Sequence, residues 1–275
     1  MFAVALDLLR QAVARRWVMA LGLAVTAALL LTGLSLRLDV VDGALSATRL
    51  FGQVLARDVV AIDVALRPVF SAAAYLIVYG FTAFLVLATA DFGPSLLLPG
   101  RIEHLLALPV RRWELLVGTY VGVCLLATMA AGYGAGGLTL VLGAKTGVWT
   151  LRPLLAGLMG VVAFATVYAV MLTTAVLVRS AAVSAAVGAA FYVTGIVAGF
   201  RDAIAAALDE GFIRTGFLVA SAVVPRLSQL AGQAATFAGG QPVGLGSVAA
   251  VLTGFVMFAA GVMTFGVWLF ERKDY

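Results

Sequence analysis

Hydrophobic positions along the chain gather in long uninterrupted runs, and charged positions are confined to the segments between those runs. A helix rises about 1.5 Å per residue, so about 20 apolar residues cross the roughly 30 Å hydrocarbon core of a bilayer. Strands of a membrane barrel would instead alternate over about 10 residues. Six runs meet the helical criterion, at about 17–36, 69–90, 115–142, 154–178, 183–200 and 247–270. We therefore predict an all-α, polytopic integral membrane protein with a single transmembrane domain over 1–275.

Composition supports a membrane environment. Hydrophobic residues make up 63% of the 275 residues and charged residues 11%, whereas soluble domains average about 45–50% and about 25%. A chain this apolar lacks the polar surface that a water-soluble protein needs. In lipid every backbone polar group must be paired within the protein, which favours helices here.

The segment before the first run has the pattern of an amphipathic helix. Leu6, Leu9 and Val13 recur at three- and four-residue spacing, with polar residues between them. We expect an interfacial helix over 1–16 that leads into the first span.

The segment 37–68 also suggests an amphipathic helix. Its polar residues Arg49, Gln53 and Arg57 lie at helical spacing, with apolar residues between them. A short helix at the outer membrane interface is the structure we expect before the second span.

The third run is too long for a straight, upright span and contains the glycine-rich stretch 132–137. Glycine weakens a helix interior, so we expect a tilt, a kink or a break there.

The segment 201–246 contains an apolar stretch, Phe212–Val224, that ends at Pro225. Thirteen residues are too few to cross a bilayer, so this stretch predicts a re-entrant or interfacial segment before the sixth span. A weaker amphipathic stretch, Arg226–Phe237, follows it. The alternative is a seventh span, which would move the C-terminus to the other side of the membrane.

Orientation follows from the number of spans and from the distribution of positive charge. An even number of spans puts both termini on one side. With the termini inside, short segments carry 9 of the 18 basic residues at high density, and short loops count most in the positive-inside rule. We expect both termini to be cytoplasmic, in the cell (inner or plasma) membrane. The inside basic residues are then Arg10, Arg15, Arg16, Arg101, Arg111, Arg112, Arg179, Arg272 and Lys273.

Several chemistries lack the residues that they need. The interiors of the six predicted spans hold no charged residue, which disfavours ion-coupled transporters and charged channels. The only cysteine, Cys124, and the only histidine, His104, are too few for a zinc site or an intramembrane protease. The nearest approach to a P-loop, Gly143-Ala144-Lys145-Thr146, lacks both required glycines. We expect no catalytic residue, cofactor, metal or nucleic-acid partner.

The segment between the second and third runs has the clearest pattern outside the spans. Ile102, Leu105 and Leu106 would share one face of a two-turn helix, which Pro109 would end. Such a helix is too small to be a domain, and its apolar face can rest on lipid or on a partner.

This segment resembles the permease subunits of ABC-2 type ATP-binding-cassette transporters. An acidic residue, Asp91, ends the second run, and a glycine then precedes Ile-Glu-x-Leu-Leu-x-x-Pro-Val-x-Arg and the acidic Glu114. The six-span layout, the basic N-terminus and the charged tail Glu271-Arg272-Lys273-Asp274 are similar too. One departure is Gly93-Pro94-Ser95 with three leucines, where the family usually has an acidic run.

The resemblance implies a coupling helix that docks onto a separate ATPase subunit. ATP-driven closure of two ATPases would move two permease subunits, identical or paralogous, and open an outward path. The implied ATPase-coupling residues are Ile102, Glu103, His104, Leu105, Leu106, Pro109, Arg111 and Arg112. The alternative is that the arginines are ordinary positive-inside anchors and the leucines lie on lipid.

Three function classes follow from these patterns. The first is the membrane subunit of an ATP-driven exporter that depends on a partner for ATP hydrolysis. The second is an ATP-independent facilitator, or a membrane assembly or structural factor. The third, an intramembrane enzyme, is disfavoured by the missing catalytic residues. The patterns do not identify a substrate.

Overall fold

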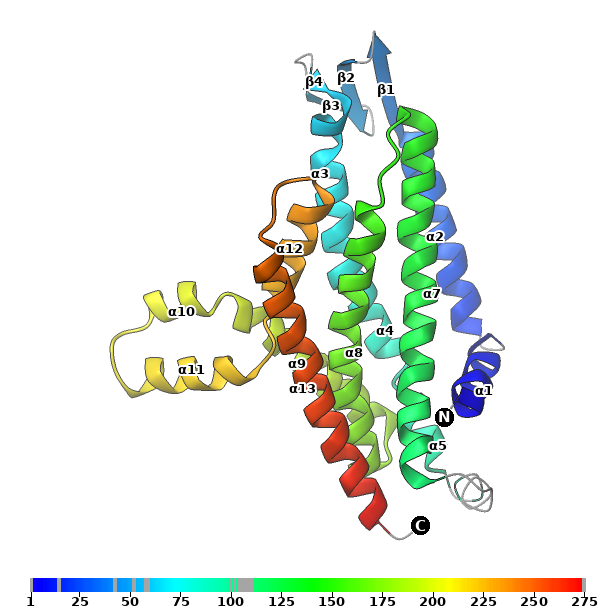
Figure 1. Cartoon of the computed structure of the whole chain (residues 1–275), viewed down its shortest axis with the longest axis vertical. Helices are drawn as coiled ribbons and strands as arrows, with labels where there is room; N and C mark the ends of the chain where they lie inside the picture. Colours follow the sequence, from blue (N-terminus) through cyan, green and yellow to red (C-terminus); the bar gives the residue numbers. More distant parts are fainter. Residues whose placement is uncertain are drawn as a thin grey trace.

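The computed structural model describes residues 2–13, 16–41, 44–50, 53–56, 60–98, 100, 102 and 111–273. Within this part of the chain, long helices run side by side and a small sheet lies at one end of the bundle (Figure 1). Both chain termini lie at the opposite end. We refer to these as the strand end and the terminal end.

The long helices are compatible with a polytopic membrane protein. In the described part of the chain, five helices are apolar and long enough to cross a bilayer: Leu66–Leu96, Arg112–Thr146, Arg152–Val178, Ala181–Gly199 and Leu245–Arg272. They coincide with the second to sixth predicted runs. The first run coincides with α2 (Arg16–Ser35), in which the described apolar stretch is the shorter Leu21–Leu34.

The spans differ in regularity. The second comprises α3 (Ile62–Tyr75), a π-helical segment η1 (Leu76–Phe81) and α4 (Thr82–Ala88), followed by the short α5 (Phe92–Leu96). The other long helices are continuous: α7 (Arg112–Thr146), α8 (Arg152–Val178), α9 (Ala181–Gly199) and α13 (Leu245–Arg272).

The core of the bundle is α8. It packs against α7, α9, α12 and α13, and large side chains such as Phe164, Tyr168 and Leu172 are almost completely buried. Small residues let its neighbours approach closely. A Cβ added to Gly266 of α13 would lie 2.6 Å from Oγ1 of Thr173. Because of this close packing, a displacement of α8 would also displace the helices around it.

The expected helix over 37–68 is wrong for most of that segment. Four strands form an antiparallel sheet: β1 (Leu36–Val41), β2 (Ala44–Leu50), β3 (Gln53–Ala56) and β4 (Val60–Ala61), with β2 paired to the other three. The sequence contains the reason. Leu36–Val40 alternates apolar and polar residues with the period of a strand.

The glycines of the third span do not break it. The helix α7 continues through them from Arg112 to Thr146. Gly137 instead lies against Leu29 of α2, at a position where an added Cβ would overlap the leucine side chain. Nearby, the hydroxyls of Thr26 and Tyr133 are 2.7 Å apart. These glycines therefore permit close packing of α2 on α7.

The N-terminal segment forms α1 (Phe2–Val13), in agreement with the expected helix. Its buried face consists of Ala5, Leu8 and Ala12, whereas Leu6 is exposed. This face of α1 is buried because α1 closely approaches α7. A Cβ on Gly122 of α7 would lie 3.1 Å from Cα of Ala5. The alanines on this face, Ala5 and Ala12, therefore permit the close approach, and Leu8 is buried with them.

Three short helices connect α9 to α13. They are α10 (Arg201–Ala207), α11 (Phe212–Val223) and α12 (Leu227–Ala238). At about 1.5 Å per residue, the 12 residues of α11 are too short to form a seventh span. The helix α12 packs into the bundle, where Oγ of Ser228 donates to the carbonyl of Ile196 at 2.9 Å.

Candidate coupling site

The structure describes three of the eight coupling residues that the resemblance implied. Ile102 is buried, Arg111 precedes α7, and Arg112 is the first residue of α7. The other five lie outside the described residues: Glu103, His104, Leu105, Leu106 and Pro109. The described part of the site consists of the two flanks of the segment 97–111.

The first flank is buried against the bundle. Phe92, Leu96 and Leu97 are each at least 96% buried, and α5 packs on α8 and α9. Gly93 makes the closest approach, because a Cβ at this position would lie 2.8 Å from Cβ of Ala175 in α8. A larger side chain at position 93, such as an acidic one, would not fit in this contact.

The chain turns immediately after this flank. Gly100 adopts a φ of +81°, a left-handed conformation that glycine reaches without strain. The N–H of Ile102 then donates to the carbonyl of Leu98 at 3.1 Å, and the Ile102 side chain is buried. The left-handed backbone at Gly100 therefore marks a turn between α5 and Ile102.

The second flank is a helix start. Arg111 has an extended backbone, and its N–H donates to Oε2 of Glu114 at 3.2 Å. A carboxylate in the first turn also interacts favourably with the helix dipole. Glu114, the acidic residue in the family pattern, therefore helps to fix the residue at which α7 begins.

A set of three hydrogen bonds ties this helix start to two other helices. Nη1 of Arg112 donates to the carbonyl of Lys273, just after α13, at 3.0 Å. Nζ of Lys273 donates to the carbonyls of Val176 and Leu177 at 2.7 and 3.0 Å. These carbonyls belong to the last turn of α8, where a cation is favoured by the helix dipole. We call Arg112, Lys273 and the last turn of α8 the three-helix tie.

Both flanks of the segment 97–111 are thus fixed to the same end of α8. Gly93 fixes one flank by packing and Arg112 fixes the other by hydrogen bonding through Lys273. Rigid contacts of this kind let a force on the segment displace α7, α8 and α13 together. The sequence drew attention to Lys273 and Gly93 but not to these contacts, because their partners are distant in the chain.

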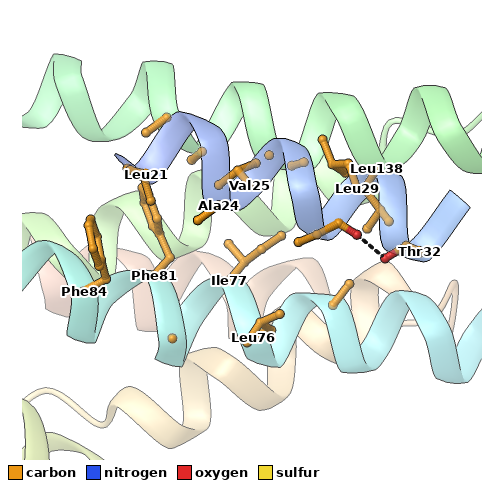
Figure 2. A pocket seen from close by; sticks show the side chains of 17 residues that line it. Leu21, Ala24, Val25, Leu29, Thr32, Leu76, Ile77, Phe81, Phe84 and Leu138 are labelled. Carbon is orange, nitrogen blue, oxygen red and sulfur yellow. Dashed lines mark hydrogen bonds between the residues drawn. The ribbon is translucent and has the colours of Figure 1, made fainter. Parts of the chain in front are cut away.

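An apolar groove of about 360 Å³ lies between α2, η1 and α7. Figure 2 shows Val25 and Leu29 on one wall and Ile77 and Phe81 on the other. Among the residues that line it, Thr32 uses its hydroxyl to donate to the carbonyl of Ala28. The groove therefore suits an aliphatic group and offers no charged ligand.

In the part of the chain that the structure describes, no group of three or more His, Cys, Asp and Glu side chains is arranged to hold a metal ion. Comparison with known protein families and with curated proteins finds no match.

Proposed function

We propose that this chain is the membrane subunit of an ATP-driven exporter of the ABC-2 type. It would form the translocation path and receive its driving force from a separate ATPase. In this proposal α2 is the first of six spans, and the terminal end faces the cytoplasm. Two observations support that arrangement. Both termini and α5 lie at the same end of the bundle (Figure 1), and the short segments at that end are basic.

The observation that carries the proposal is the anchoring of both flanks of the segment 97–111 to α8. A lipid-facing loop needs no such attachment. A coupling element does, because a push from an ATPase moves the spans only if the element cannot slide over them. The buried α5 and the three-helix tie supply this resistance on opposite flanks.

The mechanism then has two steps. Closure of two ATPases around ATP displaces the segments 97–111 of two permease subunits, which are identical or paralogous. Each segment displaces α7, α8 and α13 as one body, and the path between the two subunits opens outward. The energy enters through the partner, consistent with a chain that has no P-loop.

The test is purification of the tagged protein from its native membrane, followed by mass spectrometry for P-loop ATPases and by an ATPase assay. We expect a stoichiometric ATPase whose association weakens in the variants Glu103→Ala and Arg111→Ala. The matched control is Arg10→Ala, an exposed arginine of α1, which should leave association unchanged. A purified, folded protein without any associated ATPase would refute the proposal and favour an ATP-independent role.

A further inference from the structure

The second span is interrupted by the π-helical segment η1, between α3 and α4. Such segments are rare and disturb the regular hydrogen-bond ladder of a helix. At its end, the carbonyl of Tyr79 accepts from the N–H of Thr82, only three residues further along. The same carbonyl accepts from the hydroxyl of Tyr192 in α9 at 3.1 Å. The π-helical form is thus supported by a donor from outside the span.

Thr82, the first residue of α4, lacks a bond that other buried threonines make. The hydroxyls of Thr89, Thr119 and Thr139 donate to the carbonyl four residues earlier, at 2.7, 2.8 and 3.0 Å. Thr82 is 0% exposed, and its Oγ1 has no hydrogen-bond partner among the residues that the structure describes. The corresponding acceptor would be the carbonyl of Val78, which lies within η1. A buried hydroxyl without a partner is unfavourable.

We propose that η1 is a two-state hinge that alternates between this π-helical form and an α-helical form. In the α-helical form the carbonyl of Val78 lies one regular turn before Thr82, and the Thr82 hydroxyl donates to it. In the π-helical form the Tyr192 hydroxyl binds the carbonyl of Tyr79 instead. Each form gains one hydrogen bond that the other lacks. The two forms are therefore close in free energy and can interconvert.

The change in η1 must be taken up within the span, because both ends of the span are fixed. Gly93 packs closely on Ala175 at one end, and Oγ of Ser71 donates to the carbonyl of Ala235 at 2.9 Å at the other. The helix is interrupted again at 89–91, between α4 and α5. The additional residue of the π-helical turn moves to this break, and α4 turns about its own axis between the two irregular points.

The apolar groove gives α4 room to turn. On one side η1 is held by α8, where a Cβ added to Gly160 would lie 3.3 Å from Cγ2 of Ile77. On the other side Phe81 and Phe84 line the groove that faces α2 (Figure 2). Turning of α4 displaces Phe84 and changes the shape of the groove while the ends of the span stay packed. The use of this change in transport rests on the proposed function, whereas the hinge itself does not.

The first experiment compares Thr82→Val with the matched control Thr89→Val. Both threonines are 0% exposed, and valine has nearly the same shape. Thr82→Val removes a hydroxyl that has no partner in the π-helical form, so Tm in detergent should not fall. Thr89→Val removes a hydroxyl that donates to the carbonyl of Leu85, so Tm should fall. An equal fall in both variants would overturn the proposal.

The second experiment measures amide hydrogen exchange over 76–84 in the purified protein, without any ATPase. Thr82→Val should slow exchange about fivefold, because the α-helical form loses its bond and is visited less often. Tyr192→Phe should accelerate exchange about fivefold, because the π-helical form loses its bond. The matched control is Tyr168→Phe, whose hydroxyl has no partner in the described part of the chain. Changes in the same direction, or no change in either variant, would contradict the hinge.

The link to transport is measured separately, in the complex with its ATPase. Thr82→Val should leave the ATPase bound and lower the transport per ATP hydrolysed, although the variant is not less stable. Opposite exchange effects without any associated ATPase would support the hinge and refute the exporter. An associated ATPase together with equal exchange in the two variants would support the exporter and refute the hinge.

Discussion

Arg112 and Lys273 lie 161 residues apart in the chain and are joined by a 3.0 Å hydrogen bond from the guanidinium of the first to the backbone carbonyl of the second. Through this bond the start of α7 is held to the end of α13. The Lys273 ammonium continues the connection to the last turn of α8, so that three spans meet at one lysine. The segment 97–111, which we call the coupling segment, ends next to Arg112. Lys273 is therefore a positioning residue in the proposed mechanism.

Replacing Lys273 by Met keeps the length of the side chain and removes both hydrogen bonds to α8. We expect a loss of about 1–2 kcal/mol in the free energy of unfolding. This corresponds to a fall of about 3–6 °C in Tm, measured in detergent. Lys273→Arg should recover most of the loss, because the guanidinium also donates to carbonyls.

A purely structural role for Lys273 predicts only this loss of stability, whereas a positioning role also predicts a change in the coupling of ATP hydrolysis to transport. In the variant Lys273→Met we expect the ATPase to remain bound while the transport per ATP hydrolysed falls. Transport that declines only in proportion to the amount of folded protein would contradict the positioning role.

Gly93 provides a test of the other flank. In the variant Gly93→Ala the new Cβ lies 2.8 Å from Cβ of Ala175 and 3.0 Å from Cδ1 of Leu172, so α5 must move away from α8. Overpacking of this kind destabilises by about 1–3 kcal/mol. The matched control is Gly261→Ala in α13, where an added Cβ meets nothing within 4 Å and helix propensity favours alanine. Equal thermal unfolding curves for the two variants would refute the close packing of α5.

The sequence was most informative where one physical requirement dominates. Lipid forces backbone groups to pair within a span, so hydrophobic runs alone locate α7, α8, α9 and α13 to within a few residues. Outside the spans, one segment can fit both the period of a helix and the period of a strand. Arg49, Gln53 and Arg57 have helical spacing, yet Arg49 pairs in register with Arg37 in a sheet.

In the coupling site too, local sequence indicates some residues and gives no sign of the contacts of others. The resemblance pointed to Arg111 and Arg112 from local sequence, and both lie at the start of α7. Lys273 appeared only as part of a charged tail, since nothing near it in the sequence shows that its ammonium lies against Val176 and Leu177. Contacts between distant parts of a chain leave no local pattern.

The contact between Thr26 and Tyr133 tests whether α2 is a packed span. Their hydroxyls are 2.7 Å apart and join α2 to α7. A double-mutant cycle with Thr26→Val and Tyr133→Phe should give a coupling energy of about 0.6 kcal/mol, the average for side-chain hydrogen bonds between spans. Thermal unfolding of the four proteins measures it. Strictly additive effects would indicate that α2 does not pack on α7 through this bond.

The orientation of the bundle can be tested by labelling from outside the cell. In a Cys124→Ala background, Glu103→Cys lies in the coupling segment and Thr48→Cys lies in β2 at the strand end. A membrane-impermeant maleimide should label Thr48→Cys on intact cells and Glu103→Cys only after permeabilisation, because the positive flanks of the coupling segment favour the cytoplasm. A general thiol reagent after solubilisation controls for the reactivity of each cysteine. If the impermeant reagent reaches Glu103→Cys on intact cells, no cytoplasmic ATPase can contact this segment, and the exporter proposal fails regardless of how firmly α8 is held.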